Sequence, residues 1–445
     1  MHRLTYITFL LVLLGTAAPA QEKKGLSYYD KITYDAYLRG DWHEVIRAGR
    51  AALEEGLDYY YLRMRLGIAC YTLKNYHQAI RHFRKALSFN RKDVTAMKYL
   101  YYAYLFSGRE ADRRALINHM PARLRDEINT GRISGLIGLE LSAEYFTNND
   151  RDGVDDYDPA GLPDEKGYQS FVRQGGSGAL LFTTLPGENT TLSLGYRFLS
   201  KDRFLYLHND EGEYTLPDNT FTQHQLYGSL AFRLAEGLNM SLSFNYLNLR
   251  TAIPTTAYGN RLYMVTASTG DFTSYLLLRK DLPYLSLYGG AGLSGMNNAT
   301  QLQTDAGVVV YPFGNLNLYF GSGITYLIQG SFSGGMRQQE DIIWSPFAGF
   351  RIAGTLWGEL FATTGDISNY QSALGWMLYN EQNPVSFSSG LNLTWVIPKN
   401  GMMISFSPLW SKAASRFFPA DDITNSYYPI DYQMLNFKIK IKWNF

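Results

Sequence analysis

From residue 133 to the end of the chain, apolar and polar residues alternate. The clearest runs are Leu192–Phe198 and Leu238–Tyr246, where the intervening positions are mostly Ser, Asn and Gly. Such alternation predicts β-strands with one apolar and one polar face. Many of these strands would span roughly nine to fifteen residues, which is longer than usual in soluble sheets and suits a tilted strand that crosses a bilayer.

The connections between these strands alternate between short turns and long polar loops. The short turns are 185–189, 235–239, 280–283, 312–315, 353–358 and 398–401. The long loops are 147–167, 201–218, 251–260, 330–340, 366–384 and 411–430, with a shorter one near 296–300. Short turns on one side and long loops on the other are typical of an outer-membrane barrel. We therefore predict an antiparallel transmembrane β-barrel of about 14 strands over residues 133–445, with about 12 or 16 strands as alternatives.

The last strand ends on a bulky apolar residue. One face carries Leu435, Phe437, Ile439, Ile441, Trp443 and Phe445, and the other carries Asn436, Lys438, Lys440, Lys442 and Asn444. This ending resembles the assembly signal of bacterial outer-membrane proteins, which implies recognition of Phe437, Ile439, Ile441, Trp443 and Phe445 by the barrel assembly machinery. We expect the strand to pair with the first one near residues 136–145, with its apolar face toward lipid and its lysines toward the lumen.

Residues 21–132 have a helical pattern with a period of 34 residues. Apolar residues recur at helical spacing, Gly and Pro are sparse, and two segments beginning at Leu38 and Leu73 align. The matching pairs are Trp42 with Tyr76, Val45 with Ala79, Ala52 with Ala86, and Leu53 with Leu87. These positions resemble the tetratricopeptide repeat, which implies a short α-helical solenoid of about three repeats.

The resemblance also implies a concave surface formed by the first helix of each repeat. The tyrosines carried onto this surface are Tyr34, Tyr37, Tyr61, Tyr71 and Tyr102. A row of tyrosines would suit extended peptides or sugars, because each offers a flat apolar face and a hydroxyl. The alternative is that the rings pack between helices or against the next domain.

Residues 1–20 have the pattern of a cleaved signal peptide. Arg3 precedes the apolar run Ile7–Leu14, and Ala18 and Ala20 occupy the small-residue positions of a cleavage site. This run is shorter than the roughly 20 residues of a membrane-spanning helix, which disfavours an uncleaved anchor. Export supports the membrane barrel over the competing interpretation, a soluble β-sandwich, which at roughly 310 residues would be unusually large.

Composition agrees with a strand-rich or membrane-facing protein. Aromatic residues make up 15% of the chain and charged residues only 18%, against roughly 25% charged residues in average soluble chains. The net charge of +1 gives no indication of a nucleic-acid partner. Cys70 is the only cysteine, so an internal disulfide framework is excluded.

The first long loop contains the segment NNDRDGVDDYD, which resembles the first half of a calcium-binding loop of the EF-hand type. Asn148, Asp150, Asp152 and Asp156 would supply oxygen ligands around a turn glycine. Pro159 stands where the bidentate Glu is expected, so the alternative is a solvated acidic loop. Calcium is the one ligand ion that the sequence suggests, and no other cofactor is expected.

Catalytic motifs are absent. The barrel region holds two histidines, His208 in a long loop and His224 on a strand with Ser229 nearby, and neither lies in a lipase or protease motif. We expect no enzymatic activity. The glycine-rich segment 288–295 lies in a strand context and more plausibly relieves crowding in the barrel wall than binds phosphate.

Helical repeats followed directly by a barrel resemble the YaiO-like outer-membrane barrels and, more distantly, the exopolysaccharide export porins. This resemblance implies an outer-membrane protein whose periplasmic repeats recruit a protein or polysaccharide for envelope transport or assembly. The alternative is a non-conducting barrel that anchors the repeats as a scaffold for protein interactions. A barrel enzyme is a third hypothesis, with His224 as its candidate residue.

Overall fold

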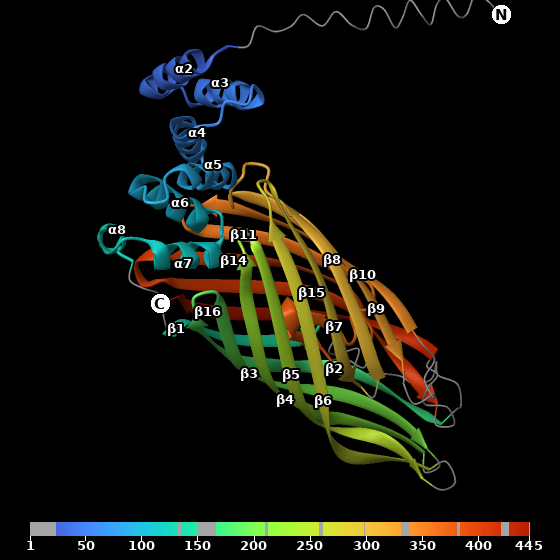
Figure 1. Ribbon diagram of the computed structural model, residues 1–445. Coiled ribbons are helices and arrows are strands. Elements are labelled where there is room, and N and C mark those ends of the chain that lie inside the picture. Colours follow the sequence, from blue (N-terminus) through green and yellow to red (C-terminus); the bar gives the residue numbers. More distant parts are fainter. Residues whose placement is uncertain are drawn as a thin grey trace, which may run out of the picture.

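The computed structural model describes residues 24–130, 135–149, 166–209, 212–257, 261–297, 299–330, 339–380, 383–419 and 427–444. The predicted signal peptide and the boundary predicted between residues 132 and 133 lie outside these residues. The helices are α2 (Leu26–Arg39), α3 (Trp42–Glu54), α4 (Tyr60–Thr72), α5 (Tyr76–Phe89), α6 (Val94–Phe106), α7 (Glu110–His119) and α8 (Ala122–Glu127). They gather at one end of a β-barrel (Figure 1).

Fourteen strands of the described chain close into this barrel, as predicted, and the alternatives of 12 and 16 strands are wrong. They are β1 (Gly135–Asn148), β2 (Gly167–Gly187), β3 (Thr190–Asn209), β4 (Gly212–Ala235), β5 (Leu238–Ala257), β6 (Arg261–Asp281), β7 (Leu285–Met296), β8 (Ala299–Val310), β9 (Leu318–Gly330), β10 (Gln339–Ala353), β11 (Leu356–Thr364), β14 (Val385–Ile397), β15 (Met402–Pro419) and β16 (Tyr427–Asn444). Each strand pairs antiparallel with its sequence neighbour around the barrel.

The first and last strands form the closing seam. β1 pairs with β16 from Gly138 opposite Asn444 to Asn148 opposite Met434. Phe437 and Ile439 are 41% and 52% exposed on the outside of the barrel. On the lumen side Lys440 lies 4.0 Å from Glu140. The expected pairing and faces are therefore present, whereas Phe445 lies outside the described residues and its role stays a prediction.

The outer surface of the barrel is apolar and the lumen is polar. Large exposed hydrophobic side chains project from almost every strand, among them Leu194, Leu226, Phe244, Phe272, Leu293, Ile324, Trp344, Leu360, Trp395 and Ile439. The alternate positions point inward and include buried Gln225, Asn245, Gln303 and Gln329. This inside-out pattern excludes the soluble sandwich, because a sandwich buries its apolar faces against each other.

The helices repeat every 34 residues. Helices α2, α4 and α6 begin at Leu26, Tyr60 and Val94, and α3, α5 and α7 begin at Trp42, Tyr76 and Glu110. Asp41, Asn75 and Asp93 cap three of them with a side-chain oxygen. Glycines allow close packing between helices, since a Cβ at Gly67 would lie 2.6 Å from the Phe83 ring.

Four predicted loops differ from the structure. Residues 201–209 and 212–218 belong to β3 and β4, residues 251–257 belong to β5, and residues 411–419 and 427–430 belong to β15 and β16, so these strands extend well beyond the predicted ends. Polar composition suggested loops there, but cross-strand pairing continues along both edges. The fourth case, 366–384, does not project from the barrel and is described below.

Candidate functional site

The five tyrosines predicted on the helical repeats differ in their surroundings. Tyr34 and Tyr61 are 47% and 64% exposed. Tyr71 packs edge-on against two other rings between helices, Tyr37 packs on Trp42, and Tyr102 stacks on Phe106. Two of the five rings are therefore strongly exposed, although Arg65 lies over the Tyr34 ring and Tyr60 packs on Tyr61, and whether the five bind a partner stays a prediction.

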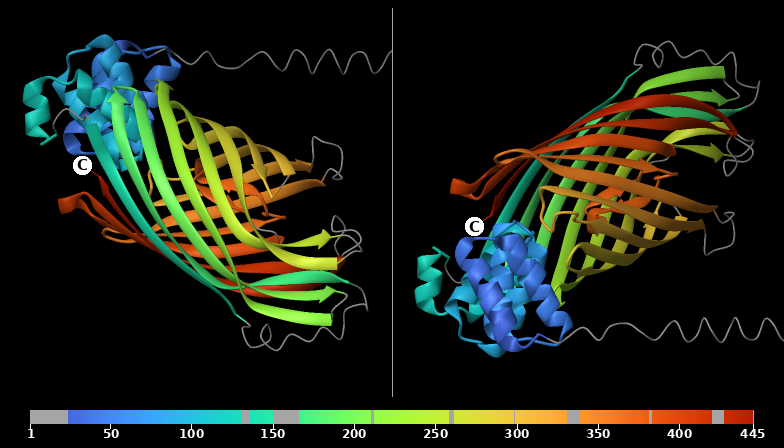
Figure 2. Two further views of the ribbon diagram at one scale, coloured as in Figure 1. Left: turned by 90° about the horizontal axis from the view of Figure 1, so that it is seen from below. Right: turned by 90° about the horizontal axis from the view of Figure 1, so that it is seen from above.

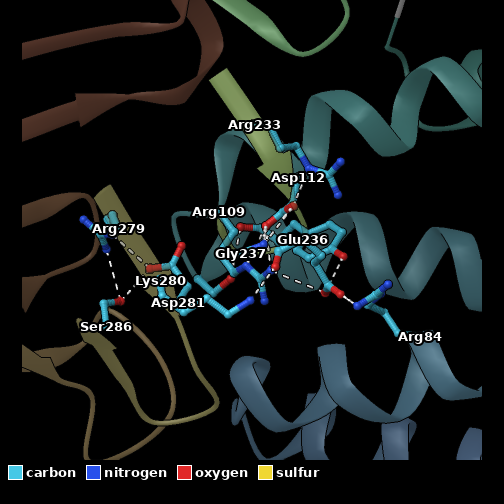
Figure 3. Close-up of polar contacts among 12 residues, drawn as sticks. Arg84, Arg109, Asp112, Arg233, Glu236, Gly237, Arg279, Lys280, Asp281 and Ser286 are labelled. Carbon is cyan, nitrogen blue, oxygen red and sulfur yellow. Dashed lines mark hydrogen bonds and ion pairs between the residues drawn. The ribbon is translucent and has the colours of Figure 1, made fainter. Parts of the chain in front are cut away.

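The helices dock on the short-turn end of the barrel through a buried ionic cluster, here called the junction (Figure 3). At its centre is Asp112 of α7, whose side chain is 2% exposed. Its carboxylate accepts hydrogen bonds from Arg109 at 2.6 Å, from Nε of Arg233 at 2.6 Å and from the backbone N–H of Gly237 at 3.1 Å. One carboxylate thus joins a helix to the β4–β5 turn.

Glu236 in the same turn connects to three helices. Its carboxylate accepts a hydrogen bond from Tyr104 Oη at 3.0 Å, lies 3.3 Å from Arg109, and pairs with Arg84 of α5. Burial raises the pKa of Tyr104 to about 12, so this hydroxyl stays a proton donor at neutral pH. The junction therefore contains two acidic groups with three arginines packed around them.

Helix α5 touches two further turns. Asn75 donates to Tyr284 Oη at 2.8 Å, and Asn315 donates to the Lys74 carbonyl at 2.9 Å. The His77 ring stacks on Tyr311 with ring centroids 4.7 Å apart. Burial, aided by the charge of Arg109, lowers the pKa of His77 from 6.5 to about 4. Docking therefore favours neutral His77.

Residues 366–380 fold into the barrel lumen and form a hairpin, here called the luminal hairpin (Figure 2). It contains the short strands β12 (Tyr370–Ser372) and β13 (Met377–Tyr379), joined by the turn at Ala373–Gly375. The prediction of an outward loop at 366–384 is wrong. The composition of residues 366–384 could not show that they turn inward, because polar residues are equally compatible with water outside the barrel and with a polar lumen.

Neutral polar side chains of the wall hold the luminal hairpin. Ser243 donates to the Leu374 carbonyl at 2.5 Å, and Asn245 donates to the Gly375 carbonyl at 3.1 Å. Gln303 donates to the Gln371 carbonyl at 2.9 Å and accepts from its N–H at 3.0 Å. Gln329 accepts from Asn369 at 2.9 Å. Strands β5, β8 and β9 thus bind the hairpin through side-chain amides and hydroxyls.

The opposite flank of the hairpin meets a charged part of the wall. Arg197 pairs with Glu144 at 2.5 Å, and its other nitrogen lies 3.2 Å from Met377 Sδ. Lys438 Nζ also lies 3.2 Å from this sulfur. The lumen-facing lysine of the terminal strand therefore contacts the hairpin, which the sequence did not reveal.

An apolar cluster narrows the barrel at its long-loop end. Phe171, Phe204, Phe417 and Tyr432 are buried there together. Beyond this cluster β15 pairs directly with β2, bypassing the seam strands. A cavity of about 120 Å³ separates the cluster from the hairpin. Within the described residues, the lumen is thus obstructed at two levels.

His224 and Ser229 are not brought together, and the calcium site stays a prediction because most of its residues are outside the described part of the chain. His224 is exposed on the outer face of β4, where its Nδ1 lies 2.8 Å from Tyr196 Oη, and the odd-numbered neighbours Gln223 and Gln225 are buried inward. Ser229 has the inward parity, so the two residues lie on opposite faces of β4. Asn148 is buried in β1 and donates to the Val172 carbonyl at 3.3 Å. Asp150, Asp152 and Asp156 lie outside the described residues.

Comparison of the sequence with protein-family models and with curated proteins gave no match. Solved structures with a similar arrangement include the toluene transporter TbuX of Ralstonia pickettii (9% identity, 70% of this chain and 90% of that chain, TM-score 0.43) and the toluene transporter TodX of Pseudomonas putida (8%, 75% and 92%, 0.44). A FadL homologue of Pseudomonas aeruginosa is similar too (8%, 70% and 90%, 0.41). At such low identity and TM-score, these likenesses carry no argument about function.

Proposed function

We propose that this protein is an outer-membrane channel for solutes, closed by the luminal hairpin and opened when the hairpin moves. The periplasmic helices, attached by the junction, recruit the partner or polymer that the channel serves. The apolar exterior and the closed sheet support a location in lipid. An unpaired backbone N–H or C=O group is costly in lipid, and a closed barrel leaves no strand edge with such groups. The assembly machinery of that membrane would act on the terminal strand.

The observation that carries the proposal is the chemistry between hairpin and wall. Many of the contacts are neutral hydrogen bonds among Ser, Asn and Gln side chains and backbone groups. Beside them, Ile367 packs on Leu327 and Ile343, and Arg197 and Lys438 contact the Met377 sulfur. Each neutral hydrogen bond contributes only about 0.5–1.5 kcal/mol net, because water replaces it when it breaks. A hairpin held largely by such bonds can therefore leave the wall at a lower cost than a plug held by apolar packing alone.

Backbone strain in the hairpin supports the same proposal. Ala373 and Leu374 have φ values of 49° and 61°, a region that non-glycine residues rarely occupy. Strain of this kind costs on the order of 1–3 kcal/mol per residue and is released when the segment rearranges. The strained turn is the part that Ser243 and Asn245 hold.

Planar-bilayer conductance of the full chain tests the proposal. Replacing residues 368–379 by a short Gly-Ser linker should remove the hairpin obstruction and make openings much more frequent than the rare openings of the unchanged protein. A second variant adds Phe171→Ala and Phe417→Ala, so that the apolar cluster cannot account for silence. If both variants stay silent, the channel proposal fails and the non-conducting scaffold for protein interactions takes its place.

A reversible lock sharpens this test. A Cβ built at Gly375 would lie 3.3 Å from Ser243 Oγ, so Ser243→Cys with Gly375→Cys places two thiols within bonding reach. Openings should vanish on oxidation and return on reduction. Cys70 does not interfere, because it is buried and its pKa is raised to about 11. Openings that ignore oxidation would show that the hairpin is not the gate.

A further inference from the structure

A cavity of about 400 Å³ lies between the luminal hairpin and the wall formed by β6 to β11. Tyr275, Tyr288 and Asp305 line it from the wall, and Tyr370 and Gln371 line it from the hairpin. This volume is within the range of small-molecule sites. The lining combines aromatic rings, one carboxylate and one amide, so its chemistry can be examined group by group.

Two tyrosine rings lie flat against the barrel wall because glycines make room for them. Tyr275 stands directly opposite Gly292 on β7, where a Cβ would lie 2.7 Å from its ring, and a Cβ at Gly290 would lie 2.5 Å from its hydroxyl. Tyr288 stands opposite Gly307, which in turn pairs with Gly323. A Cβ at either glycine would overlap the Tyr288 side chain.

The glycine-rich segment 288–295 therefore does relieve crowding in the wall, as predicted, and its consequence is a flat aromatic surface facing the lumen. A ring that lies along the wall presents one face to the cavity. Such a face packs well against a flat, partly apolar molecule, and the phenolic hydroxyl at its edge adds a polar contact.

Gln371 supplies the polar counterpart. Gln371 is 2% exposed, yet neither Nε2 nor Oε1 of its side chain has a hydrogen-bond partner among the described residues. Its position is fixed because Gln303 binds its backbone on both sides. A buried amide without partners is costly. One donor and one acceptor side by side suit a ligand hydroxyl, which can accept from one and donate to the other.

Asp305 limits the charge of the ligand. Its carboxylate already accepts hydrogen bonds from Gln303 Nε2 at 2.9 Å and from the hydroxyls of Tyr275 and Thr325. These donors satisfy the carboxylate, so it has no need of a cation. Its negative charge disfavours an anionic ligand. Arg279, which also lines the cavity, is paired with Asp281 at 2.9 Å.

From these groups we propose that the cavity is a binding site for a neutral sugar of one or two rings. The tyrosine faces pack on the C–H faces of the sugar, and the Gln371 amide, whose atoms are buried between hairpin and wall, turns toward the cavity to bond its hydroxyls. A hydrocarbon would fit the rings but would leave the amide unpaired. This inference rests on the proposed channel for the route by which a solute arrives, but the site itself is tested by binding alone.

Isothermal titration of the full-length protein in detergent micelles with maltose tests the site. Glucuronate serves as the anionic probe and toluene as the apolar probe. We expect saturable maltose binding and little or none for the other two. Tyr288→Ala and Gln371→Leu should each weaken maltose binding roughly tenfold, because each removes one kind of contact. Tyr196→Ala, on the outer face and 42% exposed, should leave it unchanged.

Several results would overturn the inference. They are the absence of saturable maltose binding, tighter binding of toluene or glucuronate, and binding that neither lumen variant alters. Tyr275→Phe is a control for folding. It keeps the aromatic ring, so the variant should keep most of its affinity for maltose. If the protein binds maltose but never conducts, the channel proposal is wrong and the sugar site stands. If it conducts but does not bind maltose, the sugar site is wrong and the channel proposal stands.

Discussion

The junction and the luminal hairpin are both polar contacts with the barrel, but they differ in charge. The junction places Asp112 and Glu236 among three arginines, with the Asp112 side chain 2% exposed. The hairpin is held mainly by neutral amides and hydroxyls, and the charged side chains that reach it contact the Met377 sulfur and the Asn380 carbonyl. Parting buried charges leaves each one unpaired, whereas water readily replaces neutral hydrogen bonds. The contrast indicates a permanent attachment at one site and a movable element at the other.

Removing the central carboxylate should break the junction with the largest effect. Asp112→Ala leaves Arg109 and Arg233 without their buried partner, at a cost of about 3–5 kcal/mol. Hydrogen exchange at α7 and at the β4–β5 turn should then accelerate roughly a hundredfold or more. Glu110→Ala, which removes a half-exposed carboxylate from the same helix, should change exchange very little. If Asp112→Ala and Glu110→Ala accelerated hydrogen exchange equally, a buried ionic attachment would be contradicted.

Acid should weaken the junction next most strongly. The pKa of His77 is lowered to about 4 by burial, and Arg109, Arg279 and Asp281 surround the ring. Undocking returns the pKa toward 6.5, so the undocked state gains a proton as pH falls from 6.5 to 4 and docking is lost across that window. At pH 5 the loss should be about 2 kcal/mol.

Hydrogen exchange at the junction, measured as a function of pH, tests whether protonation of His77 weakens docking. His77→Phe keeps the stacking on Tyr311 and should remove the pH dependence of exchange at the junction. Burial lowers the pKa of His82 to about 3, but it lies within the helices and pairs with Arg63, so its titration should affect helix exchange rather than the turn. An unchanged pH profile in the His77→Phe protein would contradict the assignment.

A glycine at the second contact should have a smaller effect. Gly314 has a φ of 63°, and a Cβ there would overlap the side chain of Asn75, which caps α5 and binds Tyr284. Gly314→Ala should cost about 1–2 kcal/mol of docking. Gly354→Ala is the matched control, because its φ is 45° and a Cβ there meets nothing within 4 Å. Comparable exchange in both variants would show that the contact contributes little.

The hairpin should respond to a change of only about 1 kcal/mol. Ser243→Ala removes one neutral hydrogen bond to the Leu374 carbonyl, which should raise the frequency of channel openings roughly fivefold. Ser241→Ala, two residues along the same strand face, should not change it. The comparison between the two regions would be lost if Ser243→Ala had no effect while Asp112→Ala increased conductance.

Much of the barrel could be predicted from the local pattern of apolar and polar residues, whereas most contacts of the junction and the luminal hairpin could not. Alternation marked the strands, and short turns such as 235–239 and 312–315 lie where the sequence predicted them. The junction uses residues in these same turns, but nothing about Glu236 or Asn315 distinguished them from other turn residues. Asp112 gave no signal either, because its counterparts 34 and 68 positions earlier, Gln78 and Glu44, are polar too. Helical position alone could not supply its partners on the barrel.

The sequence by itself determined the period of each element, the closing seam and the polar lumen. These follow from side-chain direction, which repeats every two residues in a strand and about every 3.6 in a helix. The tertiary structure alone decided that residues 366–380 turn inward and that α7 meets the β4–β5 turn. Those choices rest on contacts between distant residues, such as Gln225 with Gly375 and Asp112 with Arg233, which are 150 and 121 positions apart. Each partner looks like an ordinary polar residue until the fold brings it to the other.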